Sequence, residues 1–284
     1  MKRQKTNLNN SAKLYLVGTP IGNFDDMTFR AVDTLKMVDS IYCEDTRVTA
    51  LLLAHFNIKT PLKSYHVFNE NELTNPLIEE IKSGKNIAVV SDAGMPLISD
   101  PGFLASRSAI ENDIDVVVVP GPSASITALV GSGITTNSFY YHGFLNSRFG
   151  KRKQMLEELK YKTETLIIYE SPHRIKETLE FILEVFGNRY MVLCRELTKK
   201  YEEYLRGYVS EILEVVDELK GEMVLIIEGA TSTDIQEELN SKTIKEHYQF
   251  YIDQGFNSKD AMKKVALDRN IKKADVYQEI FIKK

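Results

Sequence analysis

The segment Ser91-Asp-Ala-Gly-Met-Pro-Leu-Ile-Ser-Asp-Pro-Gly102 decides the fold, because it connects a buried strand to a helix. The β-branched run at residues 86–91 predicts the strand, and a helical pattern begins near Phe103. Ala93 and Gly94 carry little or no side chain, so a ligand can approach the backbone there. Ligands favour the edge of a parallel sheet at which such loops lie. The segment therefore predicts a ligand-binding loop on an α/β sheet.

Taken alone, this loop has a second interpretation. A tight strand-to-helix connection in which Asp100 caps the helix would have a similar sequence. Three other loops of the same kind, at residues 18–23, 120–124 and 228–230, also follow predicted strands. Several glycine-containing loops at strand ends favour one shared cleft.

Apolar runs of strand length alternate with amphipathic stretches of helix length, such as residues 151–160 and 175–186. The first set of strands is expected at residues 14–18, 40–44, 86–91 and 115–119, and the second at 138–142, 165–169, 189–195 and 222–228, with 201–208 as a further antiparallel strand. This alternation predicts an α/β fold with two α/β domains, at residues 13–122 and 123–230.

The two ends of the chain have different patterns. Residues 1–12 are polar and basic, and we expect a disordered tail. Residues 231–284 contain short helical patterns and form a predicted C-terminal helical domain. Within it, residues 258–277 read as a Ser cap, a helix, a turn and a second helix, which is helix-turn-helix spacing. A helical hairpin packed on the second domain and a direct nucleic-acid contact are both consistent with that spacing.

Composition limits the classes of protein that this chain can represent. It has 284 residues, of which 43% are hydrophobic and 27% charged, which is typical of a globular protein with substantial cores. The net charge of -4 excludes a polycation, so any affinity for nucleic acid must come from local patches. No signal peptide or transmembrane segment is predicted. Cys43 and Cys194 lie in or beside apolar runs, so we expect both to be buried free thiols. Free thiols favour a reducing, cytoplasmic location.

Several catalytic signatures are missing from the sequence. It has no phosphate-binding Gly-x-x-x-x-Gly-Lys-Ser/Thr loop, no Gly-x-Gly-x-x-Gly fingerprint, no Cys/His cluster and no Gly-x-Ser-x-Gly elbow. These absences weigh against a nucleotidase, a dehydrogenase, a zinc enzyme and a hydrolase. No metal site is expected.

Five motifs in order resemble those of one known family. They are Leu16-Val-Gly-Thr-Pro-Ile-Gly-Asn23, Cys43-Glu-Asp-Thr-Arg47, the segment Ser91 to Gly102, Pro120-Gly-Pro-Ser-Ala124 and Tyr169-Glu-Ser-Pro-His-Arg174. The pattern resembles the RsmI family of ribosomal RNA methyltransferases, within the tetrapyrrole methylase superfamily. The resemblance runs from about Leu14 to Ala230 and includes the helical tail. One departure is Met95, where the family usually has Thr.

This resemblance implies a two-domain tetrapyrrole-methylase-like fold with a small C-terminal helical domain, and a homodimer. It also implies that S-adenosylmethionine binds in the cleft between the domains and that its methyl group goes to the ribose 2'-hydroxyl of a cytidine in 16S rRNA of the small ribosomal subunit. The cofactor-binding residues that it implies are Pro20, Gly22, Asp92, Ala93, Gly94, Met95, Pro96, Leu97, Ile98, Ser123, Ala124, Tyr169, Gly229 and Ala230.

Glu44, Asp45 and Arg47 are the candidate catalytic residues. They follow a predicted strand, where a carboxylate could orient or deprotonate a hydroxyl and a guanidinium could hold a phosphate. Strand alternation leaves Glu44 at the strand's exit, so it ranks first as proton acceptor. The alternative is a helix N-terminus in which Asp45 is the capping residue.

The candidate RNA-binding residues lie in two places. A run without acidic residues, from residue 144 to 154, carries four cations that suit RNA phosphates. They are Arg148, Lys151, Arg152 and Lys153. His173 and Arg174 follow another strand, where Ser171 and Pro172 are expected to open the next helix. In both places the alternative is a solvated first turn of a helix.

Two other functions fit parts of this pattern. One is S-adenosylmethionine-dependent C-methylation of a tetrapyrrole precursor, since the fold by itself does not determine the substrate. The basic patches favour RNA over such a macrocycle. The other is a non-catalytic nucleic-acid-binding protein that acts through its C-terminal helices and binds no methyl donor.

Overall fold

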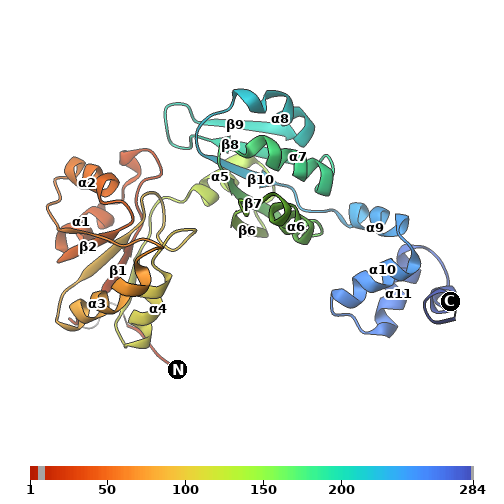
Figure 1. The fold of residues 1–284 in the computed structure, drawn as a ribbon, viewed down its shortest axis with the longest axis horizontal. Helices are drawn as coiled ribbons and strands as arrows, with labels where there is room; N and C mark the ends of the chain where they lie inside the picture. The colour runs from red at the N-terminus through yellow and green to blue at the C-terminus, as the bar shows by residue number, and fades with distance from the viewer. Residues whose placement is uncertain (6–9, 283–284) are drawn as a thin grey trace.

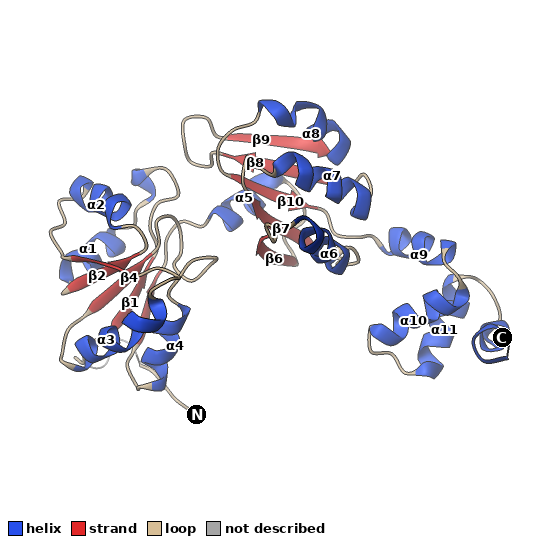
Figure 2. Cartoon of the chain, in the orientation of Figure 1, coloured by secondary structure: helices blue, strands red, loops and turns tan. Residues whose placement is uncertain are grey.

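A computed structural model of the chain describes residues 1–5 and 10–282 (Figure 1). Within these residues the strands form two sheets, each with helices packed beside it, and a group of helices lies apart from both sheets at the C-terminal end (Figures 1 and 2). The predicted α/β fold with a C-terminal helical region is confirmed.

The first sheet is entirely parallel, with strand order β3-β2-β4-β1-β5. Its strands are β1 (Leu14–Val17), β2 (Ser40–Cys43), β3 (Leu62–Ser64), β4 (Ile87–Val90) and β5 (Val116–Val119). The helices of this domain are η1 (Phe24–Asp26), α1 (Phe29–Met37), α2 (Thr46–His55), α3 (Glu70–Lys82) and α4 (Phe103–Glu111). The sequence did not predict β3, which is only three residues long and is not buried.

Buried apolar side chains fill both faces of this sheet. Val17 and Ile41 belong to one cluster, while Leu14 and Ile87 belong to the other. A strand that is buried on both faces needs a continuous apolar run, which explains why the sequence predicted the central strands. Because all strands are parallel, the loops that follow β1, β2, β4 and β5 reach the same edge of the sheet.

Two of these loops are hydrogen-bonded to each other through the backbone. The Thr19 N–H donates to the Gly94 carbonyl at 2.9 Å, and the Gly94 N–H donates back to the Thr19 carbonyl at 3.1 Å. The loops after β1 and β5 also touch, because a Cβ atom on Gly18 would lie only 2.8 Å from Cα of Gly121. Glycine is therefore required where these backbones meet.

The second sheet has strand order β6-β7-β10-β8-β9, and only β6 and β7 are parallel neighbours. Its strands are β6 (Phe139–Phe144), β7 (Thr165–Glu170), β8 (Tyr190–Arg195), β9 (Glu203–Tyr208) and β10 (Met223–Ile227). The accompanying helices are α5 (Ala124–Ser132), α6 (Phe149–Leu159), α7 (Ile175–Phe186), α8 (Val209–Val215) and η2 (Val216–Glu218). The predictions of an antiparallel strand at residues 201–208 and a helix at 175–186 are confirmed.

The helix α5 links the two sheets and packs on the second one (Figure 1). Its buried residues Ala128 and Leu129 belong to the same apolar cluster as Ile167 and Val192 of the second sheet. The chain therefore joins the second domain directly after β5, at α5.

The C-terminal helices are α9 (Ser232–Ser241), α10 (Ile244–Asp253), α11 (Ser258–Asp268), α12 (Lys273–Tyr277) and a π-helical turn, η3 (Gln278–Ile282). Asn257 caps α11 by accepting a hydrogen bond from the Asp260 N–H, so the predicted cap at Ser258 is wrong by one residue. This unit contacts the second domain through an ion pair between Lys160 and Glu238 at 2.8 Å. No helix in residues 1–5 and 10–282 is long and apolar enough to cross a membrane.

The predicted N-terminal tail is described at residues 1–5 and 10–12. Lys2 pairs with Asp113 at 2.8 Å, and the Gln4 side chain hydrogen-bonds to the backbone of Val116 at the edge of β5. The first residues therefore contact the first domain. The remainder of the predicted tail, residues 6–9, lies outside the described residues.

Candidate active site

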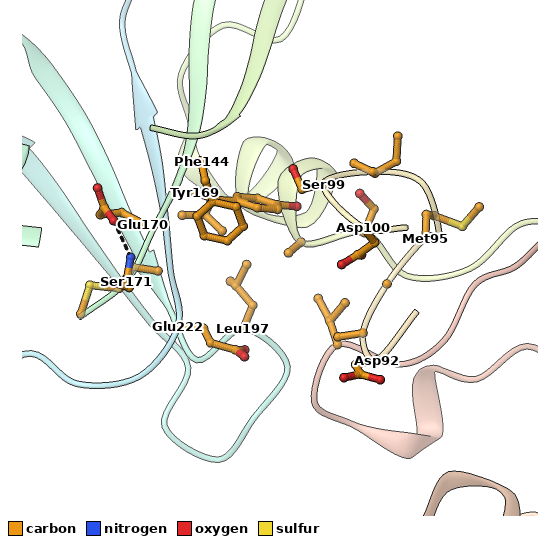
Figure 3. A pocket seen from close by; sticks show the side chains of 18 of the residues that line it. Asp92, Met95, Ser99, Asp100, Phe144, Tyr169, Glu170, Ser171, Leu197 and Glu222 are labelled. Atoms are coloured by element: carbon orange, nitrogen blue, oxygen red, sulfur yellow. Dashed lines mark hydrogen bonds between the residues drawn. The ribbon is translucent and has the colours of Figure 1, made fainter. Parts of the chain in front are cut away.

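A cavity of about 450 Å³ lies between the parallel edge of the first sheet and the adjoining ends of β7 and β10 in the second. Figure 3 shows Asp92, Met95 and Asp100 on the first-domain side, facing Tyr169 and Glu222 from the second. The full lining is Ile21, Glu44, Asp92, Ala93, Gly94, Met95, Ile98, Ser99, Asp100, Ser123, Ala124, Phe144, Tyr169, Glu170, Ser171, Pro172, Leu197, Glu222, Met223 and Val224. A volume of this size accommodates a nucleoside-sized ligand.

The backbone is strained on both sides of this cavity. Leu97 and Ser99 have φ angles of +73° and +64° in the loop after β4. Across the cavity, Glu196 and Thr198 have φ angles of +49° and +64° and flank the lining residue Leu197. Left-handed conformations cost about 1 kcal/mol or more at non-glycine residues. Such strain persists where surrounding contacts hold it, and it gathers at ligand-binding sites.

One side-chain hydrogen bond joins the two walls. The Ser99 and Tyr141 hydroxyls lie 2.7 Å apart, which connects the loop after β4 to β6. Burial raises the pKa of Tyr141 to about 12, so its hydroxyl stays protonated near neutral pH. This contact holds the loop after β4 against the second domain.

Three carboxyl groups line the first-domain wall. Burial raises the pKa of Glu44 and of Asp92 above their ordinary values, and nearby negative charge contributes to both shifts. The pKa of Asp100 rises furthest, to about 7, because burial is combined with the charges of Glu44 and Asp92. Like charges held close together favour protonation of one of them, so this wall can hold or accept a proton near neutral pH.

Two aromatic rings contribute to the second-domain wall. Phe144 and Tyr169 meet edge to face, with centroids 5.4 Å apart. The Tyr169 hydroxyl accepts a hydrogen bond from the Ser125 N–H at 3.0 Å, which ties the end of β7 to the start of α5. The next residue, Glu170, has a fully buried side chain that accepts from the Thr178 hydroxyl at 2.6 Å. These bonds fix the aromatic wall.

Known proteins resemble this chain, some in sequence and others in fold. The family model of tetrapyrrole (corrin/porphyrin) methylases matches residues 13–213. A ribosomal RNA small subunit methyltransferase I from Bacillus subtilis (strain 168) is 49% identical over 275 residues, which covers 95% of this chain and 94% of the relative. The chain belongs to the tetrapyrrole methylase family and, within it, to the ribosomal RNA small subunit methyltransferases I. A relative of the same name from Haemophilus influenzae is 46% identical over 237 residues, covering 82% of this chain and 84% of the relative.

Solved structures of tetrapyrrole methylases share the fold of this methyltransferase. The uroporphyrin-III-C-methyltransferase from Thermus thermophilus matches with a TM-score of 0.57 and 19% identity, covering 76% of this chain and 94% of that one. The methyltransferase CobJ matches with a TM-score of 0.59 and 16% identity, covering 78% and 95%. At this identity the likeness concerns the fold alone.

The structure of this methyltransferase brings most of the predicted cofactor loop to the cavity. The predicted residues that line it are Asp92, Ala93, Gly94, Met95, Ile98, Ser123, Ala124 and Tyr169. Pro96 and Leu97 belong to the same loop but are not part of the lining. Pro20 is buried, and Gly22 packs against the second domain, where a Cβ atom would lie 2.5 Å from Cγ of Lys199.

The prediction that Gly229 and Ala230 belong to the cleft is wrong. Because β10 runs antiparallel to β7, Met223 at its start pairs with Glu170 at the end of β7. The start of β10 therefore faces the cavity, and the residues after its end lie at the opposite edge of the sheet. There the Ala230 N–H donates to the Lys162 carbonyl at 2.7 Å, and a Cβ atom on Gly229 would collide with the Thr163 carbonyl.

The three candidate catalytic residues separate in the structure. Glu44 lines the cavity, whereas Asp45 and Arg47 do not. Asp45 caps α2 and forms an ion pair with Arg47 at 2.6 Å, and these bonds lower the pKa of Asp45 to about 2. The helix-capping alternative therefore describes Asp45. The Arg47 side chain is 89% exposed and remains available to a large substrate.

The predicted RNA-binding residues also separate. Arg152 is only 2% exposed and pairs with Glu177 at 2.6 Å, so its assignment to an RNA-binding surface is wrong. Lys153 pairs with Glu184 at 2.5 Å. Arg148 and Lys151 are exposed. Arg152 shares the buried face of α6 with Leu156 and Leu159, and that helical spacing is the sequence signal that could have identified its burial.

The second predicted RNA contact, after β7, also differs in detail. The helix α7 begins at Ile175, so Ser171 and Pro172 do not form its first turn but line the cavity. Arg174 pairs with the buried Glu170 at 2.7 Å, whereas His173 is exposed. Of these two side chains, only His173 is directed to solvent without an ion pair among the described residues.

Sequence reasoning missed other lining residues. Asp100 was considered only as a helix cap, but Gly102 occupies the cap position of α4. The position of Asp100 within the predicted ligand loop was the sequence signal that could have identified it as a lining residue. Leu197 and Glu222 come from the segments beside β8 and β10, and no local pattern indicates that they reach the cleft. In the described ranges, no group of three or more His, Cys, Asp or Glu side chains is arranged to hold a metal.

Proposed function

We propose that this methyltransferase transfers the methyl group of S-adenosylmethionine to the ribose 2'-hydroxyl of a cytidine in small-subunit ribosomal RNA. The observation that carries the proposal is the interdomain cavity, where the small-residue loop after β4 meets Ser123, Ala124 and Tyr169. The relatives' shared name, ribosomal RNA small subunit methyltransferase I, supports this class of substrate. The cytidine 2'-oxygen is the acceptor that the family resemblance implies.

The cavity fits the methyl donor in size and chemistry. Its volume is within the range of small-molecule sites. Ile21, Ile98 and Leu197 offer apolar contacts to a nucleoside, while Glu44, Asp92 and Asp100 offer negative charge. S-adenosylmethionine carries a sulfonium and an ammonium group, so an acidic wall complements it. When bound, it supplies an electrophilic methyl group.

The protein's contribution is mainly positioning and the removal of a proton. Methyl transfer is an in-line displacement, which proceeds fastest when acceptor oxygen, methyl carbon and sulfur are aligned. The Ser99–Tyr141 bond and the strained loops around the cavity favour one fixed geometry. A neutral hydroxyl is a weak nucleophile, and a lining carboxylate is suited to accept its proton as the new bond forms.

A product analysis tests the acceptor. A methylated 2'-oxygen cannot attack the neighbouring phosphate, so alkaline hydrolysis of treated rRNA should leave a gap in the ladder at one cytidine. Small ribosomal subunits lacking the modification, treated with the protein and radiolabelled S-adenosylmethionine, provide the material. A complete ladder despite methyl incorporation would place the methyl group on a base instead.

We also propose that RNA phosphates contact Arg148 and Lys151, the exposed part of the predicted basic run. Replacing both with Gln should weaken RNA binding and reduce the slope of log affinity against log salt by about 1 to 2. The matched control is Lys36→Gln with Lys59→Gln, the same charge change at exposed positions on the first domain. An unchanged slope in the Arg148 and Lys151 variant would leave these cations as ordinary surface charges.

The resemblance implies a homodimer, and the two buried free cysteines favour a cytoplasmic location; we propose both. Exposed apolar side chains on three elements that are consecutive in the chain support self-association: Val118 of β5 is 52% exposed, Val130 of α5 is 73% exposed and Phe139 of β6 is 43% exposed. Sedimentation equilibrium should give about twice the chain mass, and Val130→Glu should shift it towards the monomer.

A further inference from the structure

We propose that Asp100 is the group that accepts the proton from the methyl-acceptor hydroxyl. This assignment rests on the proposed function. In the reaction the acceptor oxygen forms a bond to the methyl carbon, the methyl–sulfur bond breaks, and its electron pair stays on sulfur, which becomes a neutral thioether. The acceptor O–H bond breaks, and its proton goes to the Asp100 carboxylate.

The three carboxylates of the first-domain wall differ in what already holds them. Asp92 accepts a hydrogen bond from the Asp45 N–H at 3.0 Å, so one of its oxygens is engaged in joining the loops after β2 and β4. Glu44 has no hydrogen bond or ion pair among the described residues, but His66 lies near it and partly offsets the rise that burial causes in its pKa. Among the described residues, no ion pair or hydrogen bond engages the Asp100 carboxylate. In contrast to Glu44, Asp100 also has no neighbour that favours its ionised form, so it is the carboxylate with most capacity to receive a proton.

The backbone fixes the position of Asp100. The preceding residue, Ser99, is held in a left-handed conformation with its hydroxyl 2.7 Å from that of Tyr141 on the second domain. The following residue, Pro101, is buried, and a proline restricts the conformations open to the residue before it. Asp100 thus lies at the point where the loop after β4 is tied across the cavity. A group that must meet a reacting atom benefits from such fixation.

The charges around Asp100 suit this role. Glu44 from the end of β2 and Asp92 from the end of β4 face it as like charges, and Tyr141 of β6 faces it as a neutral hydroxyl. Burial and the two negative neighbours bring its pKa to about 7. General bases work best when their pKa lies near the working pH. Because the ionised form must accept the proton, kcat should rise with pH through about 7 and then level off.

The test compares Asp100→Asn with the unsubstituted protein, using small ribosomal subunits and radiolabelled S-adenosylmethionine. Asp100→Asn keeps the shape of the side chain, so the urea midpoint should stay close to that of the unsubstituted protein. Donor affinity measured by calorimetry should fall only slightly, because Glu44 and Asp92 keep the wall acidic. The single-turnover rate constant for methyl transfer should fall about 100-fold or more. The rise of activity through about pH 7 should disappear.

A second variant separates Asp100 from its neighbour. Glu44→Gln removes one of the like charges, so the pKa of Asp100 should fall and the rising limb of the pH profile should move to lower pH. If Glu44 were the proton acceptor, Glu44→Gln would lose that limb and Asp100→Asn would keep it. That result would overturn the assignment.

Other outcomes are equally decisive. If Asp100→Asn weakens donor binding while the pH limb persists, Asp100 binds the donor and does not accept the proton. If Asp100→Asn turns over like the unsubstituted protein, only the Asp100 assignment fails. If the unsubstituted protein transfers no methyl group to the subunits, the proposed function fails and the assignment fails with it.

Discussion

Gly94→Val is expected to weaken S-adenosylmethionine binding by about 100-fold or more, to below detection in titration calorimetry. Gly94 has a φ of +78°, a conformation that a β-branched residue adopts only at a cost of about 1–2 kcal/mol or more. Its Cβ atom would lie 3.4 Å from Ile21 Cγ2 and 3.6 Å from the Pro122 carbonyl, and valine adds two methyl groups beyond that point. The loop must therefore shift out of its paired position with Thr19.

The chain offers a matched control for backbone strain. Gly84, in the turn between α3 and β4, has a φ of +98°, and a Cβ atom added there would meet no neighbouring atom within 4 Å. Gly84→Val should therefore cost similar stability in urea unfolding while donor affinity stays unchanged. If Gly94→Val bound the donor as well as the Gly84→Val protein does, the loop after β4 would not belong to the donor site.

Arg152→Met should lower the free energy of unfolding by about 3 kcal/mol, because it removes a buried charge from its partners. The guanidinium donates to the carbonyls of Asn146 and Ser147 at 3.2 Å each and to Glu177 at 2.6 Å. Methionine retains much of the length and apolar surface, so the change reports the lost donors. Urea unfolding at neutral pH should show a lower midpoint with an unchanged slope.

A neighbouring substitution provides the control for this effect. Lys151 is exposed, and Lys151→Met should change the free energy of unfolding by no more than about 0.5 kcal/mol. RNA binding should show the opposite order, with the Lys151 variant weakened and the Arg152 variant retaining its affinity where it is folded. Equal stability of the two variants would contradict a structural role for Arg152.

The sequence alone located most of the first domain's cleft wall, although not Asp100. Parallel strands buried on both faces require continuous apolar runs, and these runs identified four of the five strands. Because parallel strands end at a common edge, the small residues Ala93 and Gly94 could be assigned to a ligand loop from one segment. The short, only partly buried strand β3 carries no such run and was missed.

Tertiary structure decided the second domain's wall and the partners of the charged residues. The direction of β10 depends on which distant strands it pairs with, and no local pattern encodes that choice. For this reason Met223 faces the cavity while Gly229 does not. Charge alone did not distinguish the buried Arg152 from the exposed Arg148, because that difference depends on Glu177 and Thr178 of another helix. Asp100 likewise acquires its neighbours Glu44 and Asp92 only when separate strands end side by side.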